Sequence, residues 1–123
     1  MIFSRKQLGA LGEQIALKYL RKNKYKIITT HYQKRIGEID IIAQDQNSTL
    51  VFFEVKTRTS HKFGPPAESV NWIKQQKLIK TAYWFLKESK IENQNFRIDV
   101  LTVDFDLKSK QSKIKHFRNA VWV

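Results

Sequence analysis

Apolar positions recur along this chain with two different spacings, which predict where its helices and strands lie. From Ser4 to about Asn23 they return every three or four residues, which is the period of an α-helix. Gln7 stands three residues after Ser4, as in a capping box, so the helix is predicted to begin there. The apolar stripe of this helix is expected to contain Leu8, Leu11, Ile15 and Tyr19. A second helix is predicted within residues 67–89, and its buried side is expected to contain Leu78, Ala82, Phe85 and Leu86.

Five segments are predicted to be strands, because they are rich in β-branched and aromatic residues or alternate between apolar and polar types. They cover residues 25–32, 37–44, 49–56, 95–105 and the stretch from 114 onward, which forms a fifth strand or an edge. The tetrapeptide DQNS between the second and third segments is a compact polar turn typical of a hairpin. The order α-β-β-β-α-β-β, with hairpins and two covering helices, predicts an α/β fold with a mixed β-sheet flanked by helices.

Length and composition predict one domain that covers residues 1–123. The chain shows no internal repeat and no linker, and 41% of its residues are hydrophobic, which is enough for a core. It contains no cysteine, so a disulfide framework and a thiolate metal site are both excluded. No segment has the apolar run of a signal peptide or a membrane span, so a cytoplasmic protein without a membrane partner is expected.

The charge balance indicates a polyanionic partner. Twenty-three Lys and Arg face eleven Asp and Glu, for a formal net charge of +12. Such a surplus favours nucleic acid, because lysine–phosphate contacts release counterions. Ribosome binding, a membrane surface, or a surface that is simply rich in lysine remain as alternatives. The segment 57–66, TRTSHKFGPP, is predicted to be a functional loop whose Arg58 and Lys62 lie along the bound backbone.

The third predicted strand begins with apolar residues and ends with charged ones. Successive side chains of a strand point to opposite faces, so two rows can be assigned. One row is entirely apolar and contains Val51, Phe53 and Val55. The other contains Leu50, Phe52, Glu54 and Lys56. This strand is therefore expected to run from the interior to the mouth of a site.

The preceding strand is expected to bring a second carboxylate to the same place. If the DQNS turn is centred on Asn47, antiparallel pairing sets Asp40 opposite Glu54. The same register sets Glu38 opposite Lys56. One face of the strand is then expected to carry Glu38, Asp40 and Ile42, and the other Ile39, Ile41 and Ala43. A slip of one residue would move one carboxylate to the opposite face of the sheet.

Two opposed carboxylates repel each other, but they are well placed to hold a divalent cation. Mg²⁺ prefers oxygen ligands and binds through one or two carboxylates while it keeps several waters. Lys56 on the same face would stabilise a hydroxide nucleophile or the charge of the transition state. A metal, an oriented water and a cation are what phosphodiester hydrolysis requires. The alternative for Glu54 and Lys56 alone is a surface salt bridge.

Glu13 is predicted to lie at the edge of the apolar arc of the first helix. Gly9 and Gly12 weaken that helix by about 1 kcal/mol each relative to alanine, which is reasonable if it packs closely on a sheet and offers a carboxylate at the rim. The alternative is a surface ion pair between Glu13 and a lysine such as Lys18, or an arginine. Asp99 is expected to balance Arg97 or a lysine rather than to bind metal. The scattered histidines His31, His61 and His116 are not predicted to be metal ligands.

The segments GEIDIIA and FFEVKTR, together with GALGEQIA, FGPPAESV, KQQKL and FRIDVL, carry a resemblance that covers nearly the whole chain. They resemble the PD-(D/E)XK nuclease superfamily, in particular archaeal Holliday-junction resolvases, and more closely the YraN-type family of small uncharacterised bacterial proteins. Ile39 stands where the superfamily name has proline, a position at which that proline is often absent. The resemblance implies a restriction-endonuclease-like fold and an endonuclease that depends on Mg²⁺, for which Mn²⁺ can substitute.

By this resemblance Asp40 and Glu54 are metal ligands, Lys56 is the catalytic lysine, and Glu13 completes the site. Gln76 and Lys77 correspond to second-helix residues that face the site or the nucleic acid in related nucleases. The implied substrate is DNA rather than RNA, in branched or otherwise structured form, and symmetric cleavage of a junction would call for a homodimer. Two alternatives remain open: a nucleic-acid-binding module of nuclease fold with little or no cleavage, and a basic adaptor in DNA processing or uptake.

Overall fold

The computed structural model describes residues 3–59, 71–91 and 94–121. Two helices and five strands follow one another in the order that the sequence predicts. They are α1 (Arg5–Lys22), β1 (Lys26–Lys34), β2 (Gly37–Gln44), β3 (Leu50–Arg58), α2 (Trp72–Glu88), β4 (Phe96–Phe105) and β5 (Ser112–Val121). β3 extends through Arg58, so the predicted loop at 57–66 begins later than expected, and its residues from 60 onward lie outside the described part.

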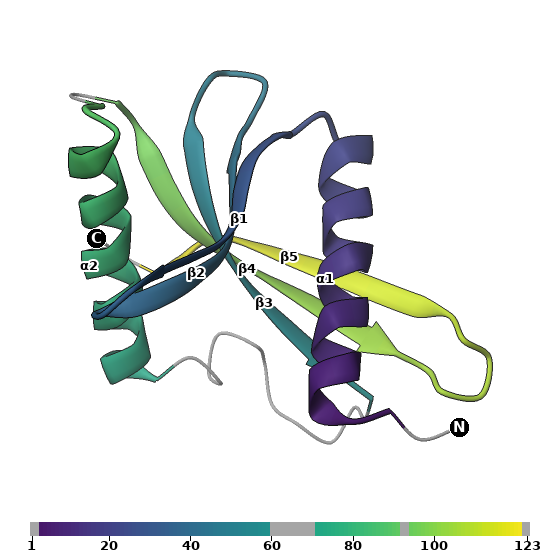
Figure 1. Ribbon diagram of the computed structural model, residues 1–123. Coiled ribbons are helices and arrows are strands. Elements are labelled where there is room, and N and C mark those ends of the chain that lie inside the picture. The colour runs from purple at the N-terminus through teal and green to yellow at the C-terminus, as the bar shows by residue number, and fades with distance from the viewer. Residues whose placement is uncertain (1–2, 60–70, 92–93, 122–123) are drawn as a thin grey trace.

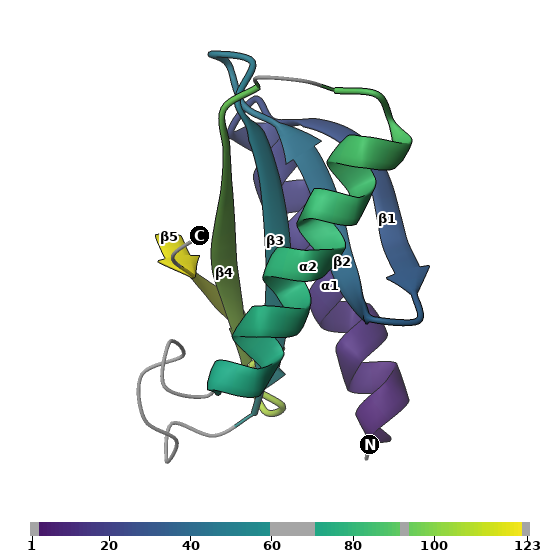
Figure 2. The ribbon, with the colours of Figure 1, turned by 90° about the vertical axis from the view of Figure 1, so that its left-hand side faces the viewer.

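The five strands form one mixed sheet in the order β1-β2-β3-β4-β5. β3 and β4 are parallel, and the other three neighbouring pairs are antiparallel. α2 stands between β3 and β4 in the chain, as a parallel connection requires. The helices lie on opposite sides of the twisted sheet (Figures 1 and 2). The predicted mixed α/β architecture is confirmed, and β5 is an edge strand.

Each face of the sheet has its own core. The α1-side core contains Ala16, Leu17, Leu20, Tyr25, Ile41, Ala43, Val51, Phe53, Leu101 and Val103. The α2-side core contains Ile39, Ile42, Leu50, Phe52, Leu78, Ala82, Phe85, Ile98, Val100 and Val121. The two rows predicted for the third strand are therefore confirmed in their apolar part. Neither helix, within the residues that the structure describes, is long and apolar enough to cross a membrane.

α1 begins with the predicted capping box, in which Ser4 and Gln7 each bond the other's backbone N–H. The predicted apolar stripe is wrong by about one position. Gly12, Ala16 and Leu20 are buried, whereas Leu8, Leu11, Ile15 and Tyr19 are only half-buried. The reason is close packing at Gly12, which turns Ala16 and Leu20 into the core and leaves Ile15 and Tyr19 packed against its edge.

Gly12 makes this close approach possible. A Cβ atom added to Gly12 would lie 1.8 Å from the Thr57 Oγ1 atom and 2.8 Å from the Thr57 Cβ atom on β3. Rotation of the threonine side chain cannot relieve the second clash, because its Cβ is fixed by the backbone. Gly9 has nothing within 4 Å of such an atom. The expectation that packing explains both glycines therefore holds for Gly12 and is wrong for Gly9.

This difference predicts opposite effects for two similar substitutions. Gly12→Ala should lower the free energy of unfolding by about 1–3 kcal/mol, because it overpacks the contact between α1 and β3. Gly9→Ala should raise it by about 1 kcal/mol, because alanine favours the helix and meets no neighbour. Urea denaturation of both variants beside the wild type measures the difference. Equal effects of the two substitutions would contradict the close contact.

The hairpin of β2 and β3 has the predicted register. Ile41 pairs with Phe53 and Gln44 pairs with Leu50, which places the centre of the turn at Asn47. The Asp45 side chain closes the turn by accepting hydrogen bonds from the backbone N–H groups of Asn47 and Thr49. These local bonds set the register that brings Asp40 toward Glu54.

The alternation of β2 is interrupted at Asp40. Ile39 and Ile42 both belong to the α2-side core, whereas Ile41 belongs to the α1-side core. The prediction that Ile39 shares a face with Ile41 and Ala43 is therefore wrong. On the neighbouring strand β1, His31 has a φ of 52°, and His31 and Asp40 are skipped in the pairing between Thr30–Ile41 and Tyr32–Ile39. Since the paired ladder of β2 and β3 also ends at Ile41, Asp40 meets β3 through its side chain.

Candidate active site

Asp40 and Glu54 approach each other where β2 separates from β3. The Asp40 Oδ2 atom accepts a hydrogen bond of 2.8 Å from the backbone N–H of Val55. Glu54 is 5% exposed. Burial, followed by the charge of Glu54, raises the pKa of Asp40 to about 7, although the hydrogen bond from Val55 opposes this shift. The two predicted metal ligands thus interact electrostatically, although the backbone ladder ends one residue short of their pair.

Two lysines supply positive charge to Glu54. The Lys56 Nζ atom lies 3.7 Å from the Glu54 Oε1 atom, as expected for side chains on one face of β3. The Lys74 Nζ atom, from the first turn of α2, lies 2.5 Å from the same oxygen. Burial, followed by the hydrogen bond and charge of Lys74, lowers the pKa of Lys56. For Lys74, burial also disfavours the charged form, but the hydrogen bond and charge of Glu54 outweigh it and raise its pKa.

Lys74 was missed by the sequence prediction, although the sequence contains a signal for it. It stands four residues before Leu78 and therefore continues the stripe of Leu78, Ala82 and Phe85 toward the N-terminus of α2. A lysine at the end of a buried stripe can lay its stem on the sheet and direct its ammonium group at a carboxylate. Asn71 caps the helix by accepting a hydrogen bond from the backbone N–H of Lys74.

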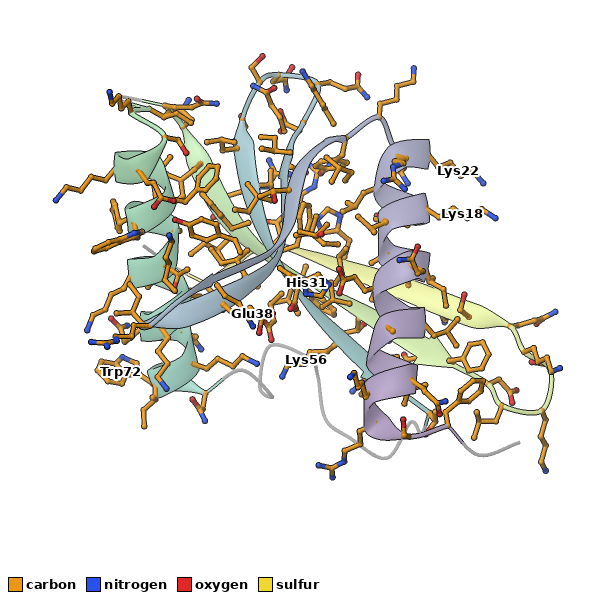
Figure 3. All side chains as sticks on the ribbon, viewed as in Figure 1. Lys18, Lys22, His31, Glu38, Lys56 and Trp72 are labelled. Carbon is orange, nitrogen blue, oxygen red and sulfur yellow. The ribbon has the colours of Figure 1, made fainter. Side chains whose placement is uncertain are left out.

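Glu13 joins the site from α1. Its Oε1 atom lies 2.8 Å from the His31 Nε2 atom, and the His31 Nδ1 atom lies 3.5 Å from the Glu38 Oε1 atom. Burial, the largest cause, and the charge of Glu38 raise the pKa of Glu13, while His31 opposes them. Figure 3 shows His31, Glu38 and Lys56 close together between the helices, whereas Lys18 points away from the outer side of α1. Glu13 therefore faces the site, and the alternative pair with Lys18 is not favoured.

His31 and Glu38 extend the cluster beyond the predicted set. His31 was not predicted to be a metal ligand, and its contact with Glu13 was missed, because a positive φ inside a strand leaves no mark in the hydrophobic pattern. Glu38 was predicted to face Lys56, but the ladder between β2 and β3 ends before that pair. Its carboxylate lies near His31 instead. Both differences follow from the irregular backbone at His31 and Asp40.

Two hollows meet at Asp40. The smaller, of about 170 Å³, is lined by Gly37, Glu38, Asp40, Glu54, Lys74, Lys77 and Leu78. The larger is a groove of about 1090 Å³ that runs between α1 and the strands. Glu38 and Asp40 line both hollows, whereas Glu54 lines the smaller one. The groove is also lined by four cationic side chains: Arg5, Lys6, Lys56 and Arg58.

The predicted nucleic-acid contacts differ in their positions. Arg58 lines the groove, and its Nε atom donates a hydrogen bond of 3.0 Å to the Asp104 Oδ1 atom. Lys77 lines the smaller hollow. Gln76 is half-buried on α2 and is not among the residues that line this hollow. Lys62 lies outside the described residues.

The donor set of the site suits Mg²⁺ chemically. Asp40, Glu54 and Glu13 offer carboxylate oxygens, which are the ligands that this ion prefers. Burial, followed by the charge of Glu54, raises the pKa of Asp40, so its ionised form is costly without a cation nearby. Within the described ranges, however, no three His, Asp or Glu side chains already converge as a metal site. Asp40 and Glu54 are therefore the pair that would hold an ion, with water in the remaining positions.

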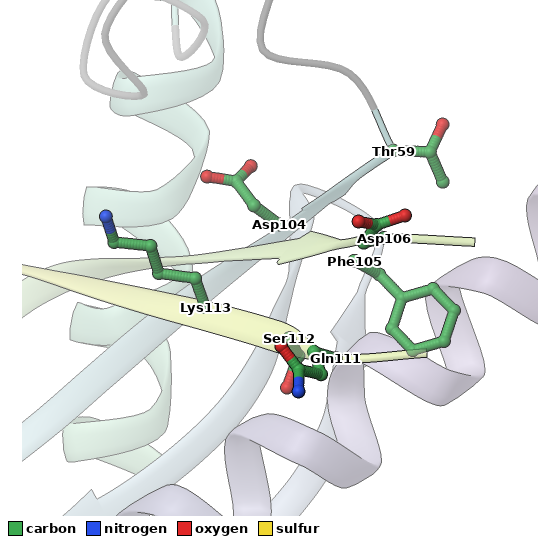
Figure 4. A pocket seen from close by; sticks show the side chains of 7 residues that line it. All are labelled: Thr59, Asp104, Phe105, Asp106, Gln111, Ser112 and Lys113. Carbon is green, nitrogen blue, oxygen red and sulfur yellow. The ribbon is translucent and has the colours of Figure 1, made fainter. Parts of the chain in front are cut away.

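Another hollow, of about 380 Å³, lies beside the turn between β4 and β5 (Figure 4). It contains Asp104 and Asp106, but both carboxylates already have partners. Asp104 accepts the hydrogen bond from Arg58, and Asp106 accepts one from the backbone N–H of Lys108 within the turn. This hollow is consequently a weaker candidate for chemistry than the cluster around Asp40.

Asp99 and His116 serve the fold instead. Asp99 is 0% exposed, and both of its carboxylate oxygens accept hydrogen bonds from the Arg97 Nε atom, so the predicted balance with Arg97 is confirmed. Asp99 also bonds the His116 ring at 2.7 Å and accepts from the backbone N–H of Asn119. The last two contacts attach β5 to β4 across the register shift between those strands.

Comparison with known sequences places the chain in a family. The sequence model described as "Uncharacterised protein family UPF0102" matches residues 12–103, which include Glu13, Asp40, Glu54 and Lys56. The chain belongs to this family. A UPF0102 protein of Alkaliphilus oremlandii is 44% identical over 117 residues, which cover 94% of this chain and 97% of that protein. A UPF0102 protein of Desulforamulus reducens is 43% identical over 122 residues, which cover 98% of this chain and 100% of that protein. The predicted membership is confirmed.

Among solved structures, this UPF0102 chain is similar to one described as the crystal structure of a repair endonuclease from Pyrococcus abyssi. The TM-score is 0.48 and the sequence identity is 14%. The alignment covers 89% of this chain and 42% of the endonuclease chain, so the matched part is less than half of that protein.

Proposed function

We propose that this protein is a metal-dependent endonuclease that hydrolyses phosphodiester bonds in DNA. The observation that carries the proposal is the juxtaposition of Asp40 and Glu54, from neighbouring strands, with Lys56 beside Glu54, where the smaller hollow and the basic groove share Asp40. Two converging carboxylates repel each other and are costly to a fold unless they serve a ligand or a reaction, and a lysine beside them offsets only part of this cost. Phosphodiester hydrolysis uses all three.

Each residue has a distinct role in this proposal. Asp40 and Glu54 would hold Mg²⁺ or Mn²⁺, with Glu13 completing the site, and the ion would polarise the phosphate and promote ionisation of a water. Lys56 donates hydrogen bonds to the phosphate oxygens that gain charge in the transition state. Its lowered pKa also makes its proton easier to transfer than that of an ordinary lysine. His31 holds Glu13 in place through their contact of 2.8 Å.

The basic groove supports nucleic acid as the substrate. Arg5, Lys6 and Arg58 line it together with the carboxylates, so a phosphate backbone in the groove would pass over Asp40. The formal net charge of +12 adds long-range attraction. DNA, in branched or otherwise structured form, is the proposed substrate class. A homodimer is proposed for paired cuts.

Binding to DNA is predicted to weaken steeply with salt. With about six phosphate contacts, affinity should fall about 10³-fold between 50 and 200 mM salt. Arg5→Ala combined with Lys6→Ala should reduce the slope of log K against log salt by about 2, because two contacts are lost. The control is Lys18→Ala combined with Lys22→Ala, which removes the same charge from the outer side of α1 (Figure 3). Fluorescence anisotropy measures the slopes of the wild type and of both variants, and equal slopes in the two variants would place the DNA elsewhere.

A cleavage assay tests the proposed function directly. Linear, nicked, flapped and four-way DNA, and an RNA of matched sequence, are incubated with the protein in Mg²⁺, Mn²⁺ or EDTA. We expect cleavage of DNA with either metal and none in EDTA. Cleavage that persists in EDTA, or that is absent from every substrate, would refute the proposal.

One observation favours a second candidate, a nucleic-acid-binding module without cleavage. The Lys74 ammonium group already contacts Glu54, which is one of the two proposed metal ligands. A protein that binds DNA with the predicted salt dependence and cuts none of the substrates would fit this alternative.

A further inference from the structure

Glu54 already has a cation at the place where a metal would bind. The Lys74 Nζ atom lies 2.5 Å from the Glu54 Oε1 atom, well within hydrogen-bonding distance. The Lys56 Nζ atom lies 3.7 Å from the same oxygen, which is too far for a strong hydrogen bond. Lys74 therefore makes the shorter contact, although Lys56 is nearer in the sequence.

The environment of Glu54 explains why it needs this partner. Its side chain is 6% exposed, and a buried carboxylate without a counterion is strongly destabilising. The carboxylate of Asp40 lines the same hollow and adds repulsion. An ammonium group on Glu54 offsets both costs while no metal is present.

The backbone of Lys74 is fixed, but its side chain is free to move away from Glu54. Its backbone is fixed by the Asn71 cap and, one turn later, by the buried Leu78. Its side chain is 41% exposed and joins the ammonium group to that backbone through four flexible carbons. The ammonium group can thus move away from Glu54 within the hollow while α2 stays in place.

We propose that Lys74 is a built-in counterion of Glu54, which a divalent cation must displace in order to bind. Resting on the proposed function, the inference also assigns Lys74 a positioning role: once released, its ammonium group remains in the hollow that it shares with Lys77, beside the path of a phosphate. The same side chain then opposes metal binding and supports the reaction. These two effects have opposite signs, which a purely structural residue would not produce.

The test removes the charge of Lys74 and keeps its apolar stem. Lys74→Met should bind Mn²⁺ about 10- to 100-fold more tightly than the wild type, since the ion no longer displaces a charged hydrogen bond. Lys74→Gln provides a second neutral variant with a polar end, in case the methionine impairs folding. Lys77→Met is the matched control, because it removes one positive charge from the same hollow and should change the affinity much less. Calorimetric titration of Mn²⁺ gives each affinity without a measurement of activity.

Two further readouts separate this inference from the proposed function. In EDTA, Lys74→Met should unfold at lower urea concentration than the wild type, and Mn²⁺ should stabilise the variant more than the wild type. Where the wild type cleaves DNA, the kcat of Lys74→Met should fall while its metal affinity rises.

In an active protein, a Mn²⁺ affinity of Lys74→Met that stays unchanged or weakens would overturn the role of Lys74 and leave the proposed nuclease activity in place. If the wild type cuts no substrate but Lys74→Met binds Mn²⁺ more tightly, the counterion role of Lys74 is supported and the proposed nuclease activity is refuted. If neither neutral variant nor the wild type binds Mn²⁺, both proposals fail.

Discussion

Asp40→Asn and Glu54→Gln should each abolish divalent-ion binding and DNA cleavage while the chain stays folded. Each change replaces a charged oxygen ligand with an amide of nearly the same shape. The asparagine oxygen can still accept the hydrogen bond from the backbone N–H of Val55. Binding of Mg²⁺ depends on the combined charge of the two carboxylates, so the loss of either should be sufficient. Calorimetric titration of Mg²⁺ and Mn²⁺, paired with cleavage rates, measures both losses.

Lys56→Ala provides the contrast within the same site. It should leave metal binding largely in place and lower the cleavage rate by about 10²- to 10³-fold, if the lysine stabilises the transition state. DNA binding should survive all three substitutions, because most of the +12 surplus lies outside the site. Unchanged metal binding in both carboxylate variants would mean that other residues hold the ion.

Asp40→Asn should also stabilise the metal-free protein at high pH and have little effect on its stability at low pH. The pKa of Asp40 rises from 3.8 to about 7 on folding, so the folded state binds more protons than the unfolded state between these values. Stability of the wild type should therefore fall as pH rises through this window. Above pH 7 the folded chain carries the full cost of the buried charge, which amounts to at most about 4 kcal/mol for such a shift.

The measurement is urea denaturation of the wild type and Asp40→Asn in EDTA, at intervals from pH 4 to pH 8. The difference between the two free energies of unfolding isolates Asp40 from other titrating groups. It should be near zero at pH 4 and grow toward pH 8 in favour of the asparagine variant. Metal affinity of the wild type should rise through the same window, because only the ionised carboxylate binds the ion. A difference that is constant across the pH range would show that folding does not raise the pKa of Asp40.

The local pattern of the sequence determined most of the fold. The capping box at Ser4, the periodic apolar residues and the DQNS turn each act over a few neighbouring positions, so their consequences can be deduced without knowing what packs against them. The hairpin register illustrates this. The Asp45 side chain closes the turn within five residues, and the register then carries Asp40 toward Glu54. Family membership is also a property of the sequence, and the family model matches the residues that contain these motifs, from 12 to 103.

Tertiary contacts decided those features that the spacing of apolar residues does not predict. The buried face of α1 follows from the contact between Gly12 and Thr57, and smallness there outweighs the hydrophobicity of Leu8 or Ile15. The positive φ of His31 and the break in alternation at Asp40 depend on how β1, β2 and β3 meet. Lys74 reaches Glu54 from twenty positions further along the chain. A sequence predicts the charge and spacing of such groups, but which of them share one carboxylate depends on the packing of elements that are distant in the chain.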